Sequence, residues 1–517
     1  MATEISVHQR ELEAKLWNMA NTLRGTMEAA EFKNYILGMI FYFYLSKRQD
    51  EYMVNLLKDD GITFKEAWDS EEYKDAVIEE TIRDLGYIIE PQYLFTEMVR
   101  RVENSTFDIE DLQKAINALM DSTMGADSEE AFEGLFDDMI LDSTKLGRTV
   151  KDRSVVMSKI VATLADITLN AENTKIDILG NAYEYLIGQF AANAGKKAGE
   201  FYTPSAPAEL LAMLACDGLT DVADACDPTC GSGSLLLRLQ NHVNVRRFWG
   251  QELTAQTFNL CRMNMILRGV AYKNFHIFNG DTLATDNFGD KQFRVQVANP
   301  PYSAHVQHPE KMPDDPRFNM YGKYVPKTKA DLAFLQHMVH HMDGDGRIAV
   351  LLPHGVLFRG NAEHEIRKFM IEKLNVIDAI IGLPANLFYG TSIPVTIIVC
   401  KKNRNGNSGN ILFIDASKEF KSGKNQNELE PTHIQKIYDT YRNRVDVPKY
   451  AHVASMDEIE KNEYNLNIPR YVDSSEDVQE IDLNEVAANI KQTNAEIEAV
   501  SAELKESFKL LGLDFPF

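Results

Sequence analysis

The sequence predicts an α/β fold in which an all-helical domain precedes a parallel sheet and a helical tail follows it. Up to about residue 175, apolar residues recur at intervals of three and four, as on helices. From residue 176 to about 420, short apolar runs alternate with helical stretches, which is typical of a parallel sheet with crossover helices. Residues 421–517 are polar and end in a helix over 483–511. We therefore expect three domains, 1–175, 176–420 and 421–517.

The composition is that of an acidic globular protein. The 517 residues carry 77 acidic and 54 basic side chains, a net charge of −23, so the chain alone is a poor match for a phosphate backbone. If the substrate is DNA, a basic partner should supply much of the binding. The apolar run from residue 35 to 45 is too short to span a bilayer, and we expect no membrane segment.

The cysteines predict a reducing compartment and no metal site. They form no CxxC pair and have no histidines at zinc-ligand spacing. With no signal peptide visible at the N-terminus, we expect buried, reduced thiols in a cytoplasmic protein. The cysteines are Cys216, Cys226, Cys230, Cys261 and Cys400.

The first 175 residues predict a packing or docking domain. Apolar stripes at helical spacing indicate helices, among them Ile109 to Met120 and Glu129 to Ile140. Such stripes are usually core, and no catalytic constellation accompanies them.

A flexible glycine and lysine stretch then leads into Glu200-Phe201-Tyr202-Thr203-Pro204-Ser205. Thr203 or Ser205 could cap a helix that begins near Pro207, leaving amide donors and two aromatic rings at the helix start. Taken alone, this segment is only a capped helix.

A strand, a glycine-rich turn and a helix follow, which is the order of a nucleotide-binding opening. The strand is Asp221 to Asp227, and the turn contains Gly231-Ser232-Gly233-Ser234. No Gly-Lys-Ser/Thr follows and the third glycine of the dinucleotide fingerprint is missing, so phosphate binding is not favoured. An amino-acid moiety suits the turn, with its carboxylate on the turn amides and its ammonium near Asp227 or a neighbouring carbonyl.

Two acidic residues end the next two predicted strands. Glu252 comes about 20 residues after the glycine turn, where an acid typically accepts ribose hydroxyls. Asp281 ends the strand that begins at Phe275 and could accept from the exocyclic amine of an adenine. Either residue alone would more often be a solvated strand end or a helix cap. Together with the glycine turn they predict one cleft for an adenosyl ligand.

The tetrapeptide Asn299-Pro300-Pro301-Tyr302 follows the strand Arg294 to Ala298. Proline cannot continue a ladder, so the two prolines end the strand and hold their carbonyls rigidly. The Asn299 carboxamide and the Pro300 carbonyl are acceptors that could hold both hydrogens of a nucleophilic amino or amide group, and Tyr302 offers a stacking face. The alternative is a strand that merely ends in a proline turn.

Five motifs thus follow one another: Gly199-Glu-Phe-Tyr-Thr-Pro204, Asp227-Pro-Thr-Cys-Gly-Ser-Gly233, Gly250-Gln-Glu252, Asn279-Gly-Asp281 and Asn299-Pro-Pro-Tyr302. In this order they resemble the S-adenosylmethionine-dependent adenine-N6 DNA methyltransferases of the γ arrangement. Nearly the whole chain is similar to the methylation (M) subunit of type I restriction-modification systems. The resemblance implies a Rossmann-like S-adenosylmethionine methyltransferase sheet.

The resemblance also implies roles for individual residues. The cofactor would be bound by Glu200, Phe201, Tyr202, Thr203, Pro204, Ser205, Asp227, Gly231, Ser232, Gly233, Ser234, Glu252 and Asp281. The target adenine would be held by Asn299, Pro300, Pro301 and Tyr302. An aromatic residue would stack on the flipped base, for which we choose Phe388 over Tyr389, with core packing as the alternative. Cys230 lies in the cofactor turn and is not expected to be a nucleophile.

The long stretch from Ser303 to Lys329 is rich in turn formers, and long loops beside a catalytic strand are usually functional. Its cations outnumber its acids, and tyrosines are interleaved, so we predict a DNA-facing clamp. A solvated loop is the alternative. The residues concerned are Arg317, Tyr321, Lys323, Tyr324, Lys327 and Lys329.

Beyond this stretch the fold resumes with alternating helices and strands from Asp331 to Leu383. The runs Val395 to Cys400 and Ile411 to Asp415 have no helix between them, which predicts a hairpin that closes the sheet.

The tail helix carries apolar residues every seven positions, which indicates a coiled-coil seam that needs a partner. They are Leu483, Ile490, Ile497, Leu504 and Leu511, with Val486 and Val500 between them. The resemblance identifies the partner as the specificity (S) subunit, and it implies a restriction (R) subunit and two M subunits per S subunit in the larger complex.

The predicted reaction is direct methyl transfer to double-stranded DNA, in which N6 of a flipped adenine attacks the sulfonium methyl in line. This chemistry needs no metal. One alternative is a protein-glutamine or ribosomal-RNA methyltransferase. These enzymes can use the same Asn-Pro-Pro-Tyr tetrapeptide, because they too must hold an amide or amino group, but they are usually shorter. A catalytically inactive assembly subunit is the third reading. The DNA recognition sequence cannot be predicted from this chain, because the partner subunit would determine it.

Overall fold

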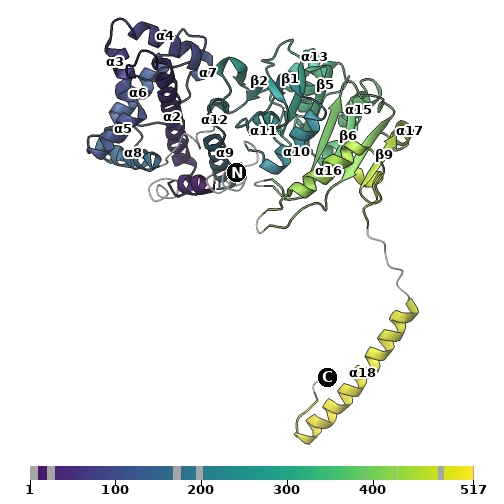
Figure 1. Cartoon of the computed structure of the whole chain (residues 1–517). Helices are drawn as coiled ribbons and strands as arrows, with labels where there is room; N and C mark the ends of the chain where they lie inside the picture. Colours follow the sequence, from purple (N-terminus) through teal and green to yellow (C-terminus); the bar gives the residue numbers. More distant parts are fainter. Residues whose placement is uncertain are drawn as a thin grey trace. The chain divides into compact units, whose positions relative to one another are not determined.

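A computed structural model of the chain describes residues 10–19, 29–166, 176–193, 202–388, 391–423, 426–475 and 483–515. It forms two compact units, Met1–Val472 and Asp473–Phe517. The first contains a helical part and a nine-stranded sheet, and the second contains the helix α18 (Leu483–Leu510) (Figure 1). The α/β fold predicted from the sequence is confirmed, and the sheet is mixed. The sheet extends beyond residue 420, where we expected the catalytic domain to end.

The N-terminal part is helical, as expected, and forms the purple and blue region of Figure 1. The helix predicted from Glu129 to Ile140 is wrong in extent, because α7 ends at Phe132 and Gly134 turns the chain with a φ of 67°. The helices are residues 10–19, α2 (Ala29–Leu56), α3 (Phe64–Asp69), α4 (Lys74–Leu85), α5 (Phe95–Glu103), α6 (Ile109–Asp121), α7 (Glu129–Phe132), α8 (Val150–Ala165) and α9 (Ile176–Asn193).

The strand order of the sheet is β3-β2-β1-β4-β5-β7-β6-β8-β9. The first five strands of this order are parallel, whereas β7 and β9 run antiparallel to their neighbours. The strands are β1 (Asp221–Asp227), β2 (Asn244–Glu252), β3 (Phe275–Asn279), β4 (Phe293–Ala298), β5 (Met342–Pro353), β6 (Ile377–Gly382), β7 (Val395–Lys401), β8 (Asn410–Asp415) and β9 (Ala451–Ser455).

The predicted hairpin between the runs at 395–400 and 411–415 is wrong. These runs are β7 and β8, and β6 lies between them, antiparallel to β7 and parallel to β8. The strand that pairs antiparallel with β8 is β9, which the polar sequence after residue 420 did not reveal.

Helices cover both faces of the sheet. Along β5, Ala349 and Leu351 belong to one buried cluster, and Ile348, Val350 and Leu352 belong to the other, as the alternation of side chains along a strand requires. The helices of this part are α10 (Ser205–Cys216), α11 (Ser234–Arg238), α12 (Ala255–Leu267), α13 (Pro316–Asn319), α14 (Asp331–His340), α15 (Asn361–Glu372), α16 (Pro431–Asn443) and α17 (Met456–Lys461).

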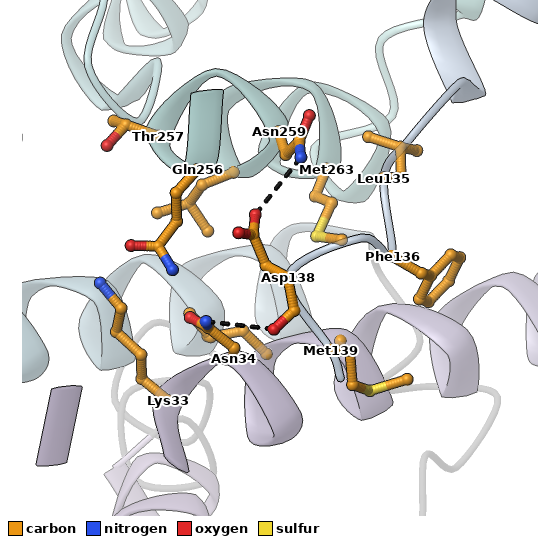
Figure 2. Close-up of a pocket in the computed structure, with 13 residues that line it drawn as sticks. Lys33, Asn34, Leu135, Phe136, Asp138, Met139, Gln256, Thr257, Asn259 and Met263 are labelled. Atoms are coloured by element: carbon orange, nitrogen blue, oxygen red, sulfur yellow. Dashed lines mark hydrogen bonds between the residues drawn. The ribbon is translucent and has the colours of Figure 1, made fainter. Parts of the chain in front are cut away.

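The helical part docks on α12, the helix that follows β2. The buried Arg262 guanidinium donates to the carbonyls of Glu130 at 2.9 Å and Glu133 at 2.7 Å, and the Tyr44 hydroxyl donates to the Ile266 carbonyl at 3.1 Å. The Glu130 and Glu133 carbonyls lie at the end of α7, where helices leave acceptors without partners. A pocket between α2, the segment after α7 and α12 has Asp138 hydrogen-bonded to Asn259 on its wall (Figure 2).

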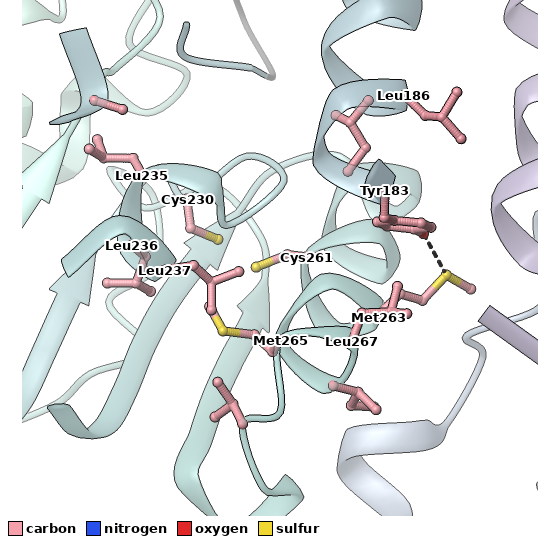
Figure 3. Packing of buried hydrophobic residues seen from close by; sticks show 14 of the residues in the cluster. Tyr183, Leu186, Cys230, Leu235, Leu236, Leu237, Cys261, Met263, Met265 and Leu267 are labelled. Carbon is pink, nitrogen blue, oxygen red and sulfur yellow. Dashed lines mark hydrogen bonds between the residues drawn. The ribbon is translucent and has the colours of Figure 1, made fainter. Parts of the chain in front are cut away.

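A second contact joins α9 to α12 beneath the sheet edge. The Tyr183 hydroxyl lies 3.4 Å from the Met263 sulfur, and the Cys230 and Cys261 sulfurs point toward one another between α11 and α12 (Figure 3). Because this core is closely packed, it sets where α12 and the turn before α11 lie.

The burial of the cysteines agrees with the prediction. All five cysteines are buried and unpaired. Of the helices in the described ranges, none is long and apolar enough to cross a membrane.

The segment from 303 to 329 is a folded insert that packs into the hydrophobic cluster on one face of the sheet, not an open loop. Met312, Phe318, Tyr321 and Val325 are buried in it. Arg317 is also buried, and its guanidinium pairs with Asp315 at 2.6 Å and donates to the Thr282 and Leu283 carbonyls at 2.7 and 3.2 Å. Arg317 and Tyr321 therefore cannot face DNA, which corrects our prediction for them. Lys323 and Lys327 remain exposed, and Tyr324 is 36% exposed.

Candidate active site

The predicted site residues share one edge of the sheet. Parallel strands present their carboxyl ends together, so Asp227 at the end of β1, Glu252 at the end of β2 and Asn299 directly after β4 lie along the same edge. Strand order reverses at β1, which pairs with β2 on one side and β4 on the other. Ligands of open α/β sheets bind at such a switch point.

Glu252 ties the glycine turn to the end of β2. One carboxylate oxygen accepts from the Gly231 amide at 3.1 Å, and the other accepts from the Thr254 amide at 2.9 Å. Gly231 and Gly233 have φ values of 54° and 77°, which side chains rarely adopt. One of the turn amides that we expected to face a ligand carboxylate is thus occupied by the protein itself.

Asp227 is a buried carboxyl group at the bottom of the turn. It is 2% exposed and accepts from the Thr229 amide at 2.9 Å. Burial raises its pKa to about 7, and the nearby Glu252 carboxylate adds to this. Burial also raises the pKa of Glu252. Two carboxyl groups with raised pKa values make this edge ready to receive a cation.

One pocket joins the glycine turn to the tetrapeptide. Its wall includes both Asp227 and Asn299. The lining residues are Tyr202, Thr203, Asp227, Thr229, Cys230, Gly231, Ser232, Ser234, Leu235 and Asn299. Seven residues that the sequence proposed are therefore brought together: Tyr202, Thr203, Asp227, Gly231, Ser232, Ser234 and Asn299.

The Asn299 carboxamide is held at both ends. Its nitrogen donates to the Thr203 hydroxyl at 3.1 Å, and its oxygen accepts from the Tyr302 hydroxyl at 2.7 Å. The helix after Thr203 begins at Ser205 with Pro204 at the cap position and no side-chain cap, so the capping role predicted for Thr203 or Ser205 is wrong. The Thr203 hydroxyl is used to orient Asn299 instead.

Tyr302 and Phe388 form an edge-to-face pair beside Asn299. Their ring centroids are 6.4 Å apart with an interplanar angle of 85°. Phe388 is only 3% exposed, whereas Tyr302 is half-buried, and burial raises the pKa of the Tyr302 hydroxyl. Tyr302 can offer part of its ring to a ligand as it stands, and Phe388 can do so only after the pair opens.

Another polar cluster, Asp286, His337 and His341, has the composition of a metal site, and the Arg317 guanidinium lies against it, while the Nε2 of His337 has no hydrogen-bond partner among the described residues. Arg317 lies 3.0 Å from the Nδ1 of His337 and 4.0 Å from the Asp286 carboxylate, and His341 bonds to Asp286 at 2.9 Å. The Arg317 guanidinium supplies the positive charge that a metal ion would bring.

The comparisons with known proteins agree with this geometry. Residues 174–480 match the N-6 DNA Methylase family, and residues 12–164 match the HsdM N-terminal domain. The chain belongs to the N-6 DNA methylase family. It is a methylase subunit of the type I restriction-modification class, an adenine-specific DNA methyltransferase. This decides against the protein-glutamine and ribosomal-RNA alternatives.

Several relatives match this methylase over nearly their whole length. The type I restriction enzyme MpnII methylase subunit of Mycoplasma pneumoniae is 34% identical, over 98% of this chain and 97% of its own. A solved type I methyltransferase subunit from Streptococcus thermophilus is 42% identical with a TM-score of 0.83, covering 90% of this chain and 99% of that one. A modification subunit from Vibrio vulnificus, 17% identical, shares the fold with a TM-score of 0.59, covering 90% of this chain and 97% of that one.

Some of the predicted residues of the methylase site do not line this pocket or fall outside the described ranges. Glu200, Phe201 and Tyr389 are not among the described residues. Asp281 follows β3 and accepts from the Leu283 amide at 2.9 Å, which stiffens the loop it begins.

Leu253 was missed by the sequence analysis. It directly follows Glu252 at the same sheet edge and is 66% exposed, an apolar surface beside the acid expected to hold a ribose. A single leucine between a strand and a helix carries no signal in the sequence. Only the strand register shows where it lies.

The contact between Thr203 and Asn299 generates a prediction for the methylase. Thr203→Val keeps the shape but removes the acceptor, so the Asn299 amide can turn, and we expect the methylation rate to fall about fivefold to tenfold. The matched control Thr203→Ser retains the hydroxyl and should stay near the wild-type rate. Single-turnover methylation of target DNA measures both, and equal rates for Val and wild type would contradict the role of the bond.

Proposed function

We propose that S-adenosylmethionine binds in the pocket that joins the glycine turn to Asn299, and this continuity is the observation that carries the proposal. The methionyl end would lie on the turn of Gly231 to Ser234, and the adenosyl end would extend toward Glu252 and Asp281. Leu253 would cover one face of the adenine. Tyr202 and Pro204 would close the pocket from the start of α10.

The charges of the pocket support this ligand. Asp227 is buried, and Thr229 is its hydrogen-bond donor among the described residues, so its carboxylate has room for a cationic partner. An amino-acid ammonium beside a sulfonium would supply it. When bound, the cofactor supplies an electrophilic methyl group.

The tetrapeptide would hold the target adenine outside the duplex. The Asn299 oxygen and the Pro300 carbonyl accept the two hydrogens of N6, which leaves electron density on nitrogen for attack along the S–C bond. An amide oxygen has two lone pairs, so Asn299 can accept from N6 while it still accepts from Tyr302. Pro301 holds the turn, and Tyr302 stacks on the base, joined by Phe388 when the ring pair opens.

DNA and subunit contacts follow from exposed residues. Lys323 and Lys327 of the insert are exposed and would meet the phosphate backbone near the flipped base. The chain as a whole is acidic, so we assign most of the DNA binding to the specificity subunit, with the restriction subunit and two methylase subunits completing the complex. Such an enzyme works where the DNA is, in the cytoplasm.

The apolar seam of α18 would bind the specificity subunit. Ile490 and Ile497 are 55% and 57% exposed, and Leu504 and Leu511 are 43% and 72% exposed. A regular apolar stripe on an exposed helix indicates a coiled-coil partner.

Asn299→Ala tests the proposed catalytic role. Removing the amide should lower single-turnover methylation by about 100-fold to 1,000-fold, the usual cost of losing one preorganised dipole. Calorimetry should show that the variant binds the cofactor with an affinity close to that of the wild type. Cofactor binding and methylation by the wild type in the same experiment would exclude an inactive assembly subunit. The control Asn117→Ala changes an exposed asparagine on α6. Retained methylation in Asn299→Ala would refute the assignment.

Cofactor binding should release a proton from Asp227. Its pKa of about 7 in the free protein falls when a cation arrives, so affinity should rise with pH up to about 7 and then level off. At pH 7 we expect release of about half a proton, measured by calorimetry in buffers of different ionisation enthalpy. Asp227→Asn keeps the Thr229 contact but cannot ionise. Unchanged proton release in this variant would assign the proton to another group.

The seam prediction has a matched control on the same helix. Ile490→Asp with Ile497→Asp puts charges on the apolar stripe and should abolish co-purification with the specificity subunit. Ala488→Asp with Ala495→Asp adds the same charges at the same spacing, away from the stripe, and should leave it intact. Cofactor binding should be normal in both. Co-purification of the seam variant would exclude α18 as the contact.

A further inference from the structure

The residue directly after the catalytic tetrapeptide has a strained backbone. Ser303 has a φ of 55°, in the left-handed region that residues with a side chain rarely adopt. Ser303 shares a peptide bond with Tyr302, whose hydroxyl donates to the Asn299 oxygen at 2.7 Å. Such strain persists only where the surroundings hold it, and it often marks a functional position.

Two side chains hold Ser303 in place. The Asp331 carboxylate accepts from the Ser303 amide at 2.6 Å, and the Lys329 ammonium donates to the Ser303 hydroxyl at 2.6 Å. Asp331 is the first residue of α14 and is 1% exposed. A hydrogen bond to a buried carboxylate is among the stronger ones available to a backbone amide.

The Asp331 carboxylate is also bound through its other oxygen. Its second oxygen accepts from the Arg359 guanidinium at 2.9 Å, and the same guanidinium nitrogen donates to Glu363 at 3.0 Å. Glu363 is 2% exposed, and a second arginine, Arg367, donates to the Arg359 carbonyl at 2.7 Å. Arg359 thus compensates the buried charge of Asp331 and leaves its first oxygen aimed at Ser303.

We propose that Asp331 is a positioning residue for methyl transfer: it clamps the Ser303 amide, and through that strained turn it places Tyr302 and the acceptor oxygen of Asn299. It does not touch the base or the cofactor. Arg359 orients Asp331, and Lys329 acts on the same turn from the insert. Lys329, which we had predicted to face DNA, is therefore assigned to the active site. The inference rests on the proposed roles of Asn299 and Tyr302.

The test compares variants in the methylase assembled with its specificity subunit, by single-turnover methylation at saturating DNA and cofactor. Asp331→Ala should slow transfer by about 100-fold, because small displacements of reacting groups cost this much. Asp331→Asn keeps an acceptor but loses the pairing with Arg359, and should slow transfer by about tenfold. Cofactor affinity measured by calorimetry should be unchanged in both.

A second-site change separates positioning from general stability. Ser303→Gly removes the cost of a positive φ, so in the Asp331→Ala background it should recover part of the lost rate without changing the melting temperature. A wild-type rate in Asp331→Ala would overturn the proposal. A joint fall of rate, cofactor affinity and melting temperature that Ser303→Gly does not relieve would also overturn it, since Asp331 would then be a structural residue.

Lys329→Met tests the same turn without creating a cavity in the core. This variant should lower the single-turnover rate and leave the DNA dissociation constant unchanged. The control Lys311→Met changes an exposed lysine of the insert and should alter neither the rate nor the dissociation constant. A reduced DNA affinity with a normal rate would overturn the assignment of Lys329. Asn299→Ala is measured in the same experiment. If Asn299→Ala still methylates DNA, the proposed function is wrong. If Asn299→Ala is inactive and Asp331→Ala has a normal rate, only the inference about Asp331 is rejected.

Discussion

The parallel pairing of β1 with both β2 and β4 is the constraint on which the site depends. Asp227 lies opposite Gly250, two residues before Glu252, and Cys226 lies opposite Gln296, three residues before Asn299. This register brings the glycine turn, the acid of β2 and the tetrapeptide to one edge. A shift by one residue would turn each of these side chains to the other face of the sheet. The core of α9, α11 and α12 beneath this edge fixes the register further.

Charge is handled differently on the two sides of the pocket. On the side of the proposed cofactor site, Asp227 is buried beside Glu252 and has a raised pKa, which suits a site that receives a cation. On the side of the proposed target site, the buried Asp331 is paired with Arg359, and its other oxygen accepts from the Ser303 amide. In our proposal the uncompensated carboxylate serves binding and the compensated one serves positioning.

Local patterns in the sequence were enough for the strands of the catalytic edge and for the residues grouped there. Asp227, Gly231 and Asn299 meet in one pocket because each follows a recognisable apolar run in a parallel unit. Non-local pairing was beyond these patterns: nothing in the runs at 395–400 and 411–415 tells that β6 lies between them. The patterns also could not predict which partner a side chain binds when two partners are plausible. Thr203 bonds to Asn299 rather than to the helix start, and the Arg317 guanidinium is used by Asp315 and by carbonyls outside the insert.

We propose that one edge of this methylase holds a methyl donor and a flipped adenine side by side, with Asn299 between them. The most direct measurement is a structure of the assembled enzyme with its target DNA and an unreactive analogue of S-adenosylmethionine. We expect the adenine N6 within hydrogen-bond distance of both the Asn299 oxygen and the Pro300 carbonyl, with the analogue along the glycine turn. A target base that stays stacked in the duplex, or an N6 held by other acceptors, would contradict the account.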